Sequence, residues 1–255
     1  MTTKQAIIKR WALAASVFML LLAPAPAALV AYYDFEGNLL DGSGQGNNGV
    51  HSSTATYSTD VAGAVSGTNS LVIGDGAGRG YMTVAHDASL AFSSGTASFS
   101  LWLKSDSPGN WNKFIDKGSV FLAERRSGNP DGRLLVNGSN MGNISNLGNI
   151  VTGGWNHIAF TLDNGTFTSY LNGTQVASLT YTGSLTTTDA LVLGAGSTGG
   201  LDAFEGFLDE VAIYDTVLTS PEVAALAAGG SPIPEPSAAL LGGLGALLLL
   251  RRRRG

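Results

Sequence analysis

Among the candidate catalytic residues, two carboxylates near the end of the chain come nearest to the spacing that a glycoside hydrolase needs. Glycoside hydrolysis needs two carboxyl groups about 5 to 10 Å apart, one as acid and the other as nucleophile or base. Glu205 and Asp209 are four residues apart in a β-rich segment and would share one face of a strand. The residue between them on that face is Phe207, and Asp209 and Glu210 are adjacent, so they point to opposite faces. The pattern argues against a glycosidase.

Other motifs for nucleophiles, thiolate-bound metals and phosphate are missing or incomplete in the sequence. There is no cysteine, which excludes disulfides, zinc–thiolate sites and a cysteine nucleophile. His157 lies in a strand pattern and His51 and His86 in polar loops, and nothing places them near a serine and an acid as a triad. The glycine-rich stretch 74–80 lacks the Gly-Lys-Ser/Thr ending of a phosphate loop. We expect a structural His157 and a simple loop at 74–80.

The charge of the chain is concentrated in its body. The sequence has 14 basic and 19 acidic residues, a net charge of −5. Seven of the basic residues lie in residues 1–27 and 237–255, which hold no acid, so residues 28–236 carry about −12. Such a body should repel nucleic acid and anionic lipid, and it suits cations and neutral sugars. Alternatively, the excess acid only keeps an exported protein soluble.

The N-terminus, residues 1–27, has the pattern of a secretory signal peptide. Lys4, Lys9 and Arg10 precede the apolar stretch 11–22, and Ala25-Pro26-Ala27 offers small residues for cleavage after Ala27. We therefore expect signal peptidase to act here and the chain to be exported. The alternative is an uncleaved membrane helix.

The C-terminus, residues 234–255, combines a short motif, an apolar run and a basic end. Pro234, Glu235 and Pro236 precede a run of about 14 residues, roughly 21 Å long as a helix, against about 30 Å for a bilayer core. The run predicts a short transmembrane helix, with a buried core helix as the alternative. Basic residues next to such a run stay on the cytoplasmic side, and four follow it here: Arg251, Arg252, Arg253 and Arg254.

Together the two ends resemble proteins that carry the PEP-CTERM sorting signal of Gram-negative bacteria. The resemblance implies recognition by an exosortase, a membrane protease that cuts near the Pro-Glu-Pro motif. It implies transient anchoring in the inner membrane, followed by delivery to the cell surface or to an extracellular polysaccharide matrix.

The body between these ends has the pattern of an all-β domain. Glycine is abundant, with 35 residues, and short β-rich runs alternate with clusters of Gly, Asn, Ser and Asp. In 97–104, Phe99, Leu101 and Leu103 would face one way and Ser98 and Ser100 the other. The remaining predicted strands are 29–35, 70–73, 81–84, 114–116, 120–123, 134–136, 157–162, 167–171, 175–179, 191–193 and 206–214.

Two Asn-Gly pairs give the clearest local signal. Asn164-Gly165 and Asn172-Gly173 separate three apolar runs and favour type I′ turns, which predicts an antiparallel meander. One helix is expected at 221–227, with Ser220 as N-cap and Pro221 in its first turn. Many short strands without crossover helices indicate a sandwich or jelly roll at 28–228, with a linker at 229–233.

Patches along this body, in order, resemble LamG-like domains of the concanavalin A type. They are Tyr33–Gly49, Phe99–Lys104, Gly154–Ala159, Tyr170–Gly173 and Gly206–Tyr214. The resemblance implies a concanavalin A-like jelly roll of two curved antiparallel sheets. Glucanases of this superfamily place their acids at alternating positions of one strand, where this sequence has Phe207.

The resemblance also implies a structural Ca²⁺ where the opening segment meets the last strand. On matching positions its ligands would come from a set of five oxygen-bearing residues: Asp34, Asn38, Asp41, Asp209 and Glu210. Calcium takes six to eight oxygen ligands, and these side chains can supply several of them. The alternative is that Asp41 forms a turn and Asp209 is a surface acid.

Carbohydrate binding is the function that the resemblance favours. Sugars bind on aromatic side chains with polar groups nearby, and Trp111 is set in a polar, loop-like context beside Asn110. Arg125 could contact an acidic glycan or simply be solvated. A structural or adhesion role in the matrix without a specific glycan is the alternative, and glycoside hydrolysis is the less favoured one.

Overall fold

The computed structural model describes residues 28–233, apart from 66, 75–79, 106–111, 119–121, 126–131, 137–138, 145–152, 197, 200–201 and 204. The predicted signal peptide and sorting signal lie outside these residues. Within them, no helix is both long and apolar enough to cross a membrane.

The larger of two main sheets has eight strands and is antiparallel throughout. Its hydrogen-bonded order is β13-β12-β11-β6-β15-β4-β3, and β1 is a further neighbour of β15. The strands are β1 Leu29–Tyr33, β3 Tyr57–Ser58, β4 Ser70–Ile73, β6 Thr96–Ser105, β11 Trp155–Asp163, β12 Thr166–Leu171, β13 Thr174–Thr180 and β15 Gly206–Tyr214.

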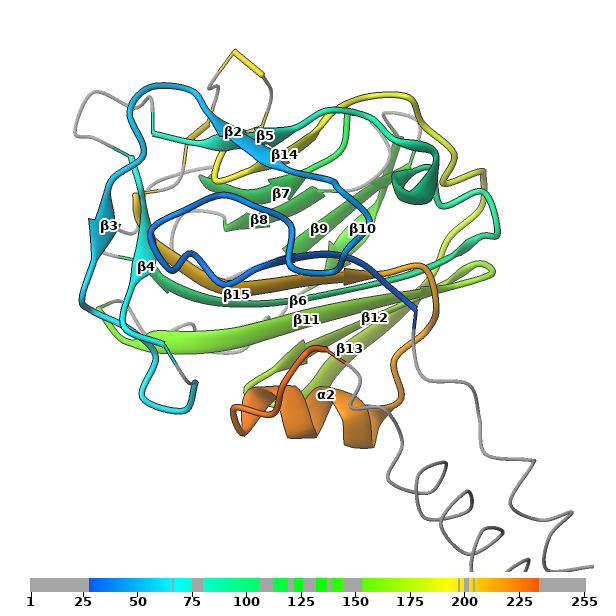
Figure 1. Ribbon diagram of the computed structural model, residues 1–255. Coiled ribbons are helices and arrows are strands. Elements are labelled where there is room, and N and C mark those ends of the chain that lie inside the picture. The colour runs from blue at the N-terminus through cyan, green and yellow to red at the C-terminus, as the bar shows by residue number, and fades with distance from the viewer. Residues whose placement is uncertain are drawn as a thin grey trace, which may run out of the picture. The chain divides into compact units, whose positions relative to one another are not determined.

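The second sheet has five strands in the order β2-β5-β14-β7-β8, and β9 and β10 form a separate hairpin. These strands are β2 Gly49–His51, β5 Met82–Val84, β7 Asn112–Asp116, β8 Leu122–Arg125, β9 Gly132–Val136, β10 Ser139–Ile144 and β14 Leu191–Leu193. Figure 1 shows the two sheets stacked face to face. The predicted all-β sandwich of two antiparallel sheets is confirmed, and it fits a jelly roll.

The main core fills the space between the sheets. Phe99, Leu101 and Leu103 of β6 belong to it, as the alternating pattern predicted, together with Met82 of β5 and Leu193 of β14. Each is at most 1 % exposed, so burial of apolar surface holds the two sheets together.

The opposite face of the larger sheet is also covered, which the pattern in β6 did not indicate. Helix α2, Ser220–Ala227, lies on that face (Figure 1), and Val223 and Leu226 pack there with Tyr170 and Tyr214. Ser98 lies under this layer, where its hydroxyl donates to the carbonyl oxygen of Thr216 at 2.7 Å.

The meander and the helix form close to their predicted positions. Asn164 and Asn172 have φ of 41° and 49°, as type I′ turns between β11, β12 and β13 require. The predicted cap of α2 was wrong by one residue: the N-cap is Thr219, whose backbone N–H donates to the Glu222 carboxylate at 2.6 Å. Reciprocal bonding between positions N-cap and N3 forms a capping box, which favours this start.

Four short elements were missed by the sequence prediction. They are β2, β3, β10 and a 3₁₀ turn at Ala88–Leu90. The segment after α2, expected as a linker, packs on the domain as far as Pro232, which is buried and accepts a hydrogen bond from the Tyr214 hydroxyl at 3.1 Å.

Candidate functional site

An irregularity in β15 creates the first candidate site. β6 pairs with β15 along one side, whereas the other side is shared between β4, opposite residues 206–208, and β1, opposite residues 211–214. The register between β15 and β6 shifts between Asp209 and Ala212, and Glu210 has a φ of 51°. Such a bulge re-aims side chains out of the regular alternation, so Asp209 and Glu210 lie where three strands meet.

Four carboxylates come together around this bulge and are called the acidic corner: Asp34, Glu36, Asp209 and Glu210. The Tyr32 hydroxyl donates to Glu210 Oε2 at 2.6 Å. The Glu36 carboxylate accepts the backbone N–H of Thr68 at 2.7 Å and that of Asn69 at 2.9 Å. Burial acts to raise the pKa of Glu36, but the hydrogen bonds from Asn69 and Thr68 outweigh it and lower the pKa.

Asp209 is the most buried member of the acidic corner, with 1 % of its surface exposed. Its Oδ1 accepts the backbone N–H of Glu210 at 2.9 Å, whereas Oδ2 has no hydrogen-bond partner among the described residues. Burial, with a contribution from the charge of Glu210, raises the pKa of Asp209 to about 8. Burial also raises the pKa of Glu210, although the bond from Tyr32 opposes it.

The five predicted calcium ligands divide into two groups. Asp34, Asp209 and Glu210 belong to the acidic corner. Asp41 instead organises the turn after β1, because its carboxylate accepts the backbone N–H groups of Tyr32, Ser43 and Asn47 at 2.8–2.9 Å. Asn38 is used in the same way, since its side-chain oxygen accepts the N–H of Leu40 at 2.8 Å.

A small cavity of about 120 Å³ adjoins the acidic corner. Asp34, Glu36 and Glu210 line it together with Tyr32 and the segment 229–232. Within the part of the chain that the structure describes, however, no three histidine, aspartate or glutamate side chains converge closely enough to hold a metal ion.

The predicted sugar-binding residues are barely covered by the structure. Asn110 and Trp111 lie outside the described residues. Arg125 ends β8, and its backbone pairs with Asn112, which follows Trp111 in the sequence. The three residues therefore remain a prediction.

The carboxylates considered for glycoside hydrolysis do not form a matched pair. Glu205 is exposed and precedes β15, whereas Asp209 is buried. The Phe207 ring between them lies 6.3 Å from the Trp155 ring, and Lys104 Nζ is 5.5 Å from the Phe207 ring centroid. This strand position therefore serves packing.

His157 is structural, as its strand pattern indicated. It is fully buried, and its Nε2 lies 2.9 Å from the hydroxyl oxygen of Ser100. Burial lowers the pKa of His157 to about 4, so the ring is neutral at pH 7. Because Ser100 is only 3 % exposed, the pair is out of reach of a substrate.

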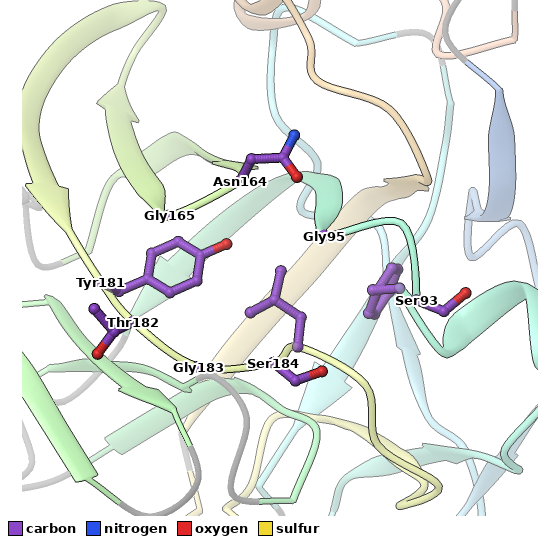
Figure 2. Close-up of a pocket in the computed structure, with 10 residues that line it drawn as sticks. Ser93, Gly95, Asn164, Gly165, Tyr181, Thr182, Gly183 and Ser184 are labelled. Atoms are coloured by element: carbon purple, nitrogen blue, oxygen red, sulfur yellow. The ribbon is translucent and has the colours of Figure 1, made fainter.

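A cleft of about 430 Å³ lies between three loops that sequence reasoning did not single out. Its walls are residues 92–95 before β6, the Asn164-Gly165 turn between β11 and β12, and residues 181–185 after β13. In Figure 2 the hydroxyl of Tyr181 points toward the space shared with Asn164 and Gly95. The sequence held no signal for this cleft, because the three loops lie far apart along the chain and carry no common motif.

Known proteins share this architecture. A family model described as "Concanavalin A-like lectin/glucanases superfamily", Laminin_G_3, matches residues 75–224. Domain 4 of the extracellular arabinanase AbnA from Geobacillus stearothermophilus, solved with arabinotriose, is 24 % identical with a TM-score of 0.61. That match covers 79 % of this chain and 98 % of that domain. No curated protein matches the chain in sequence.

Two toxin domains are similar at lower identity. The binding domains of Paraclostridial Mosquitocidal Protein 1 and of botulinum neurotoxin serotype D are each 16 % identical, with a TM-score of 0.62. Each match covers 78 % of this chain but only about half of the toxin domain, 52 % and 51 % respectively. The fold and the family match agree, and the chain belongs to the Laminin_G_3 family of the concanavalin A-like lectin/glucanase superfamily.

Proposed function

We propose that the jelly roll is a carbohydrate-binding domain without hydrolytic activity. The observation that carries this proposal is the similarity to the arabinanase domain solved with arabinotriose, because it extends over 98 % of that domain. Binding without cleavage fits the described carboxylates: Asp209 is buried, and Phe207 lies between it and Glu205 in the sequence. Glycosidases need two carboxyl groups that both reach the scissile bond.

The two ends of the sequence support a proposal for where in the cell this domain acts. We propose that signal peptidase removes residues 1–27 and that an exosortase then processes the chain near Pro234–Pro236. The domain would act at the surface or in the extracellular polysaccharide of a Gram-negative bacterium. Mass spectrometry of the mature protein tests this, and a chain that keeps its Arg251–Arg254 end at the cell surface contradicts it.

A glycan array tests the proposed function directly. We expect the full chain to bind a subset of glycans and to release no sugar from arabinan or β-glucans during prolonged incubation. Turnover that persists through purification would identify an enzyme instead. Failure to bind any glycan would favour the alternative, a structural or adhesion protein of the matrix.

Calcium at the acidic corner is a second proposal, supported by the cavity that three carboxylates line. The donors are hard oxygens of the kind Ca²⁺ prefers, and a cation there would offset the cost of burying Asp209 and Glu210 side by side. Because no three carboxylates or histidines of the described residues converge closely enough to hold a metal ion, backbone carbonyls and water would have to complete the shell. We expect Ca²⁺ to raise Tm by several degrees and a chelator to reverse this. An unchanged Tm, with no metal co-purifying, would count against the site.

A further inference from the structure

We propose that the cleft between residues 92–95, 164–165 and 181–185 is the glycan-binding site, and that it takes the end of a neutral glycan. The inference rests on the proposed carbohydrate-binding function and assigns it a place and a ligand class. The predicted platform at Trp111 shares no residue with the cleft, so the two locations can be tested separately.

The size of the cleft suits a short piece of a glycan. Small-molecule sites commonly measure about 300–1,000 Å³, and this cleft, at about 430 Å³, lies in the lower part of that range. Its three walls come from chain turns, so the opening is bounded on several sides. Such a space admits a terminal sugar or a disaccharide, whereas a long chain lying across the domain would need an open groove.

The lining has the composition that sugar recognition requires. Phe92 and Leu185 are 3 % and 2 % exposed and form an apolar base. Ser93, Asn164 and Ser184 are exposed at the rim and carry hydroxyl and amide groups. Sugars present apolar C–H faces and a fringe of hydroxyls, so an apolar base with polar groups at the rim is complementary to them.

Tyr181 carries the strongest sign of a missing ligand. The residue is 5 % exposed, and its hydroxyl has no hydrogen-bond partner among the described residues. An unsatisfied buried hydroxyl costs about 1–3 kcal/mol, and native structures satisfy most such groups. In Figure 2 this hydroxyl points toward the space beside Asn164 and Gly95. A sugar hydroxyl entering past the exposed Asn164 side chain would accept the unused O–H.

The walls of the cleft are joined to one another by backbone hydrogen bonds. The N–H of Asn164 donates to the carbonyl of Gly95 at 3.0 Å, which links the first two walls. The N–H of Tyr181 donates to the carbonyl of Gly165 at 2.7 Å, which links the second and third. A site held in this way needs little ordering when a ligand binds, which favours affinity.

The charges at the cleft select a neutral ligand. None of the ten residues that line it carries a formal charge at neutral pH. The nearest charge in the chain sequence is Asp163, an exposed acid whose Oδ1 accepts the side-chain amide of Asn164 at 3.1 Å. A carboxylate at the rim repels uronic acids and sulfated sugars, and the acidic body adds to that repulsion.

Two substitutions in the cleft and one control test the assignment in the full chain. Tyr181→Phe removes only the unpartnered hydroxyl, and Asn164→Gly removes the rim amide while keeping the positive φ that glycine tolerates. Tyr170→Phe removes a buried hydroxyl on the α2 side and serves as the control. Calorimetry would measure the affinity of each variant for arabinotriose, cellotriose and laminaritriose, with trigalacturonic acid as the acidic probe.

We expect at least one neutral trisaccharide to bind and each cleft variant to weaken that binding about tenfold. Tyr170→Phe should bind as the wild type does. Tyr181→Phe should keep or raise Tm, because it removes an unsatisfied buried group, so weaker binding could not be ascribed to unfolding.

The outcomes separate the inference from the proposed function. Unchanged affinity in Asn164→Gly and Tyr181→Phe, with the wild type binding, overturns the cleft and leaves carbohydrate binding standing. Tighter binding of trigalacturonic acid than of the neutral sugars overturns the ligand class. Binding of no glycan overturns the inference and the proposed function together.

Discussion

The Tyr32 hydroxyl and the Glu210 carboxylate, 178 residues apart in the sequence, are joined by a hydrogen bond of 2.6 Å. One residue lies in the first strand and the other in the bulge of the last strand. Burial raises the pKa of Glu210, and the bond from Tyr32 opposes that rise. The contact therefore holds the acidic corner in shape and favours the ionised form of Glu210.

Tyr32→Phe should destabilise the domain by about 1.5–3 kcal/mol, the usual contribution of a hydrogen bond to a charged group. Urea unfolding of Tyr32→Phe, Glu210→Gln and the double variant would measure the coupling between the two residues. Additive effects would show that the contact contributes nothing by itself.

Gly229→Ala should destabilise the domain more than Gly37→Ala. Both glycines have positive φ, 84° and 78°, a conformation that costs other residues roughly 1–2 kcal/mol. A Cβ at Gly37 meets no atom within 4 Å, whereas one at Gly229 would overlap the carbonyl oxygen of Ala64. The difference in unfolding free energy between the two variants thus reports the overlap. Equal losses would mean that the 229–232 segment is not held against the domain.

Acid should destabilise the wild type relative to His157→Gln. The pKa of His157 is lowered to about 4 by burial, against about 6.5 in the unfolded chain. Because the unfolded state takes up the proton first, the stability that the neutral ring contributes is lost as pH falls from 6.5 to 4, up to about 3 kcal/mol. Gln can still bond to Ser100 but does not titrate.

The test is to measure the unfolding free energy of the wild type and of His157→Gln at several pH values between 7 and 4, and to follow the difference between the two proteins. The difference matters because Asp209, with its raised pKa of about 8, changes stability in the opposite direction over this range. A difference that does not change with pH contradicts a buried neutral His157.

Glu222→Ala should cost about 1 kcal/mol, typical for the loss of a helix cap. The Glu222 carboxylate accepts both the N–H and the hydroxyl of Thr219, at 2.6 and 2.7 Å. Glu205→Ala, an exposed acid outside any helix, is the control and should leave stability unchanged. Denaturation midpoints of the two variants give the comparison, and equal midpoints would remove the capping role.

The strands could be predicted because they depend on local pattern, and the sites could not because they depend on remote contacts. Asn164-Gly165 and Asn172-Gly173 specify their turns by residue type, so β11–β13 were predictable. Nothing near Asp209 in the sequence shows that it will be buried, since the bulge and the neighbouring β1 and β4 decide this.

The five predicted calcium ligands lie in two separate groups for a related reason. Asp41 and Asn38 bond to nearby backbone N–H groups, which acidic and amide side chains do readily in turns. Asp41 thus forms the turn that was the alternative prediction, whereas Asp209 is no surface acid. Tyr181 could not be predicted as a site residue because its surroundings come from loops far apart in the chain.

The position of β15 has a consequence for the order in which the domain is made. β15 is the last strand among the described residues, yet β6, β4 and β1 all pair with it. Until residue 214 has left the ribosome, those three strands lack their common neighbour, and contacts over such long separations form slowly. Unpaired strands invite pairing with other chains in the meantime. The larger sheet can therefore be completed only after β15 has been synthesised.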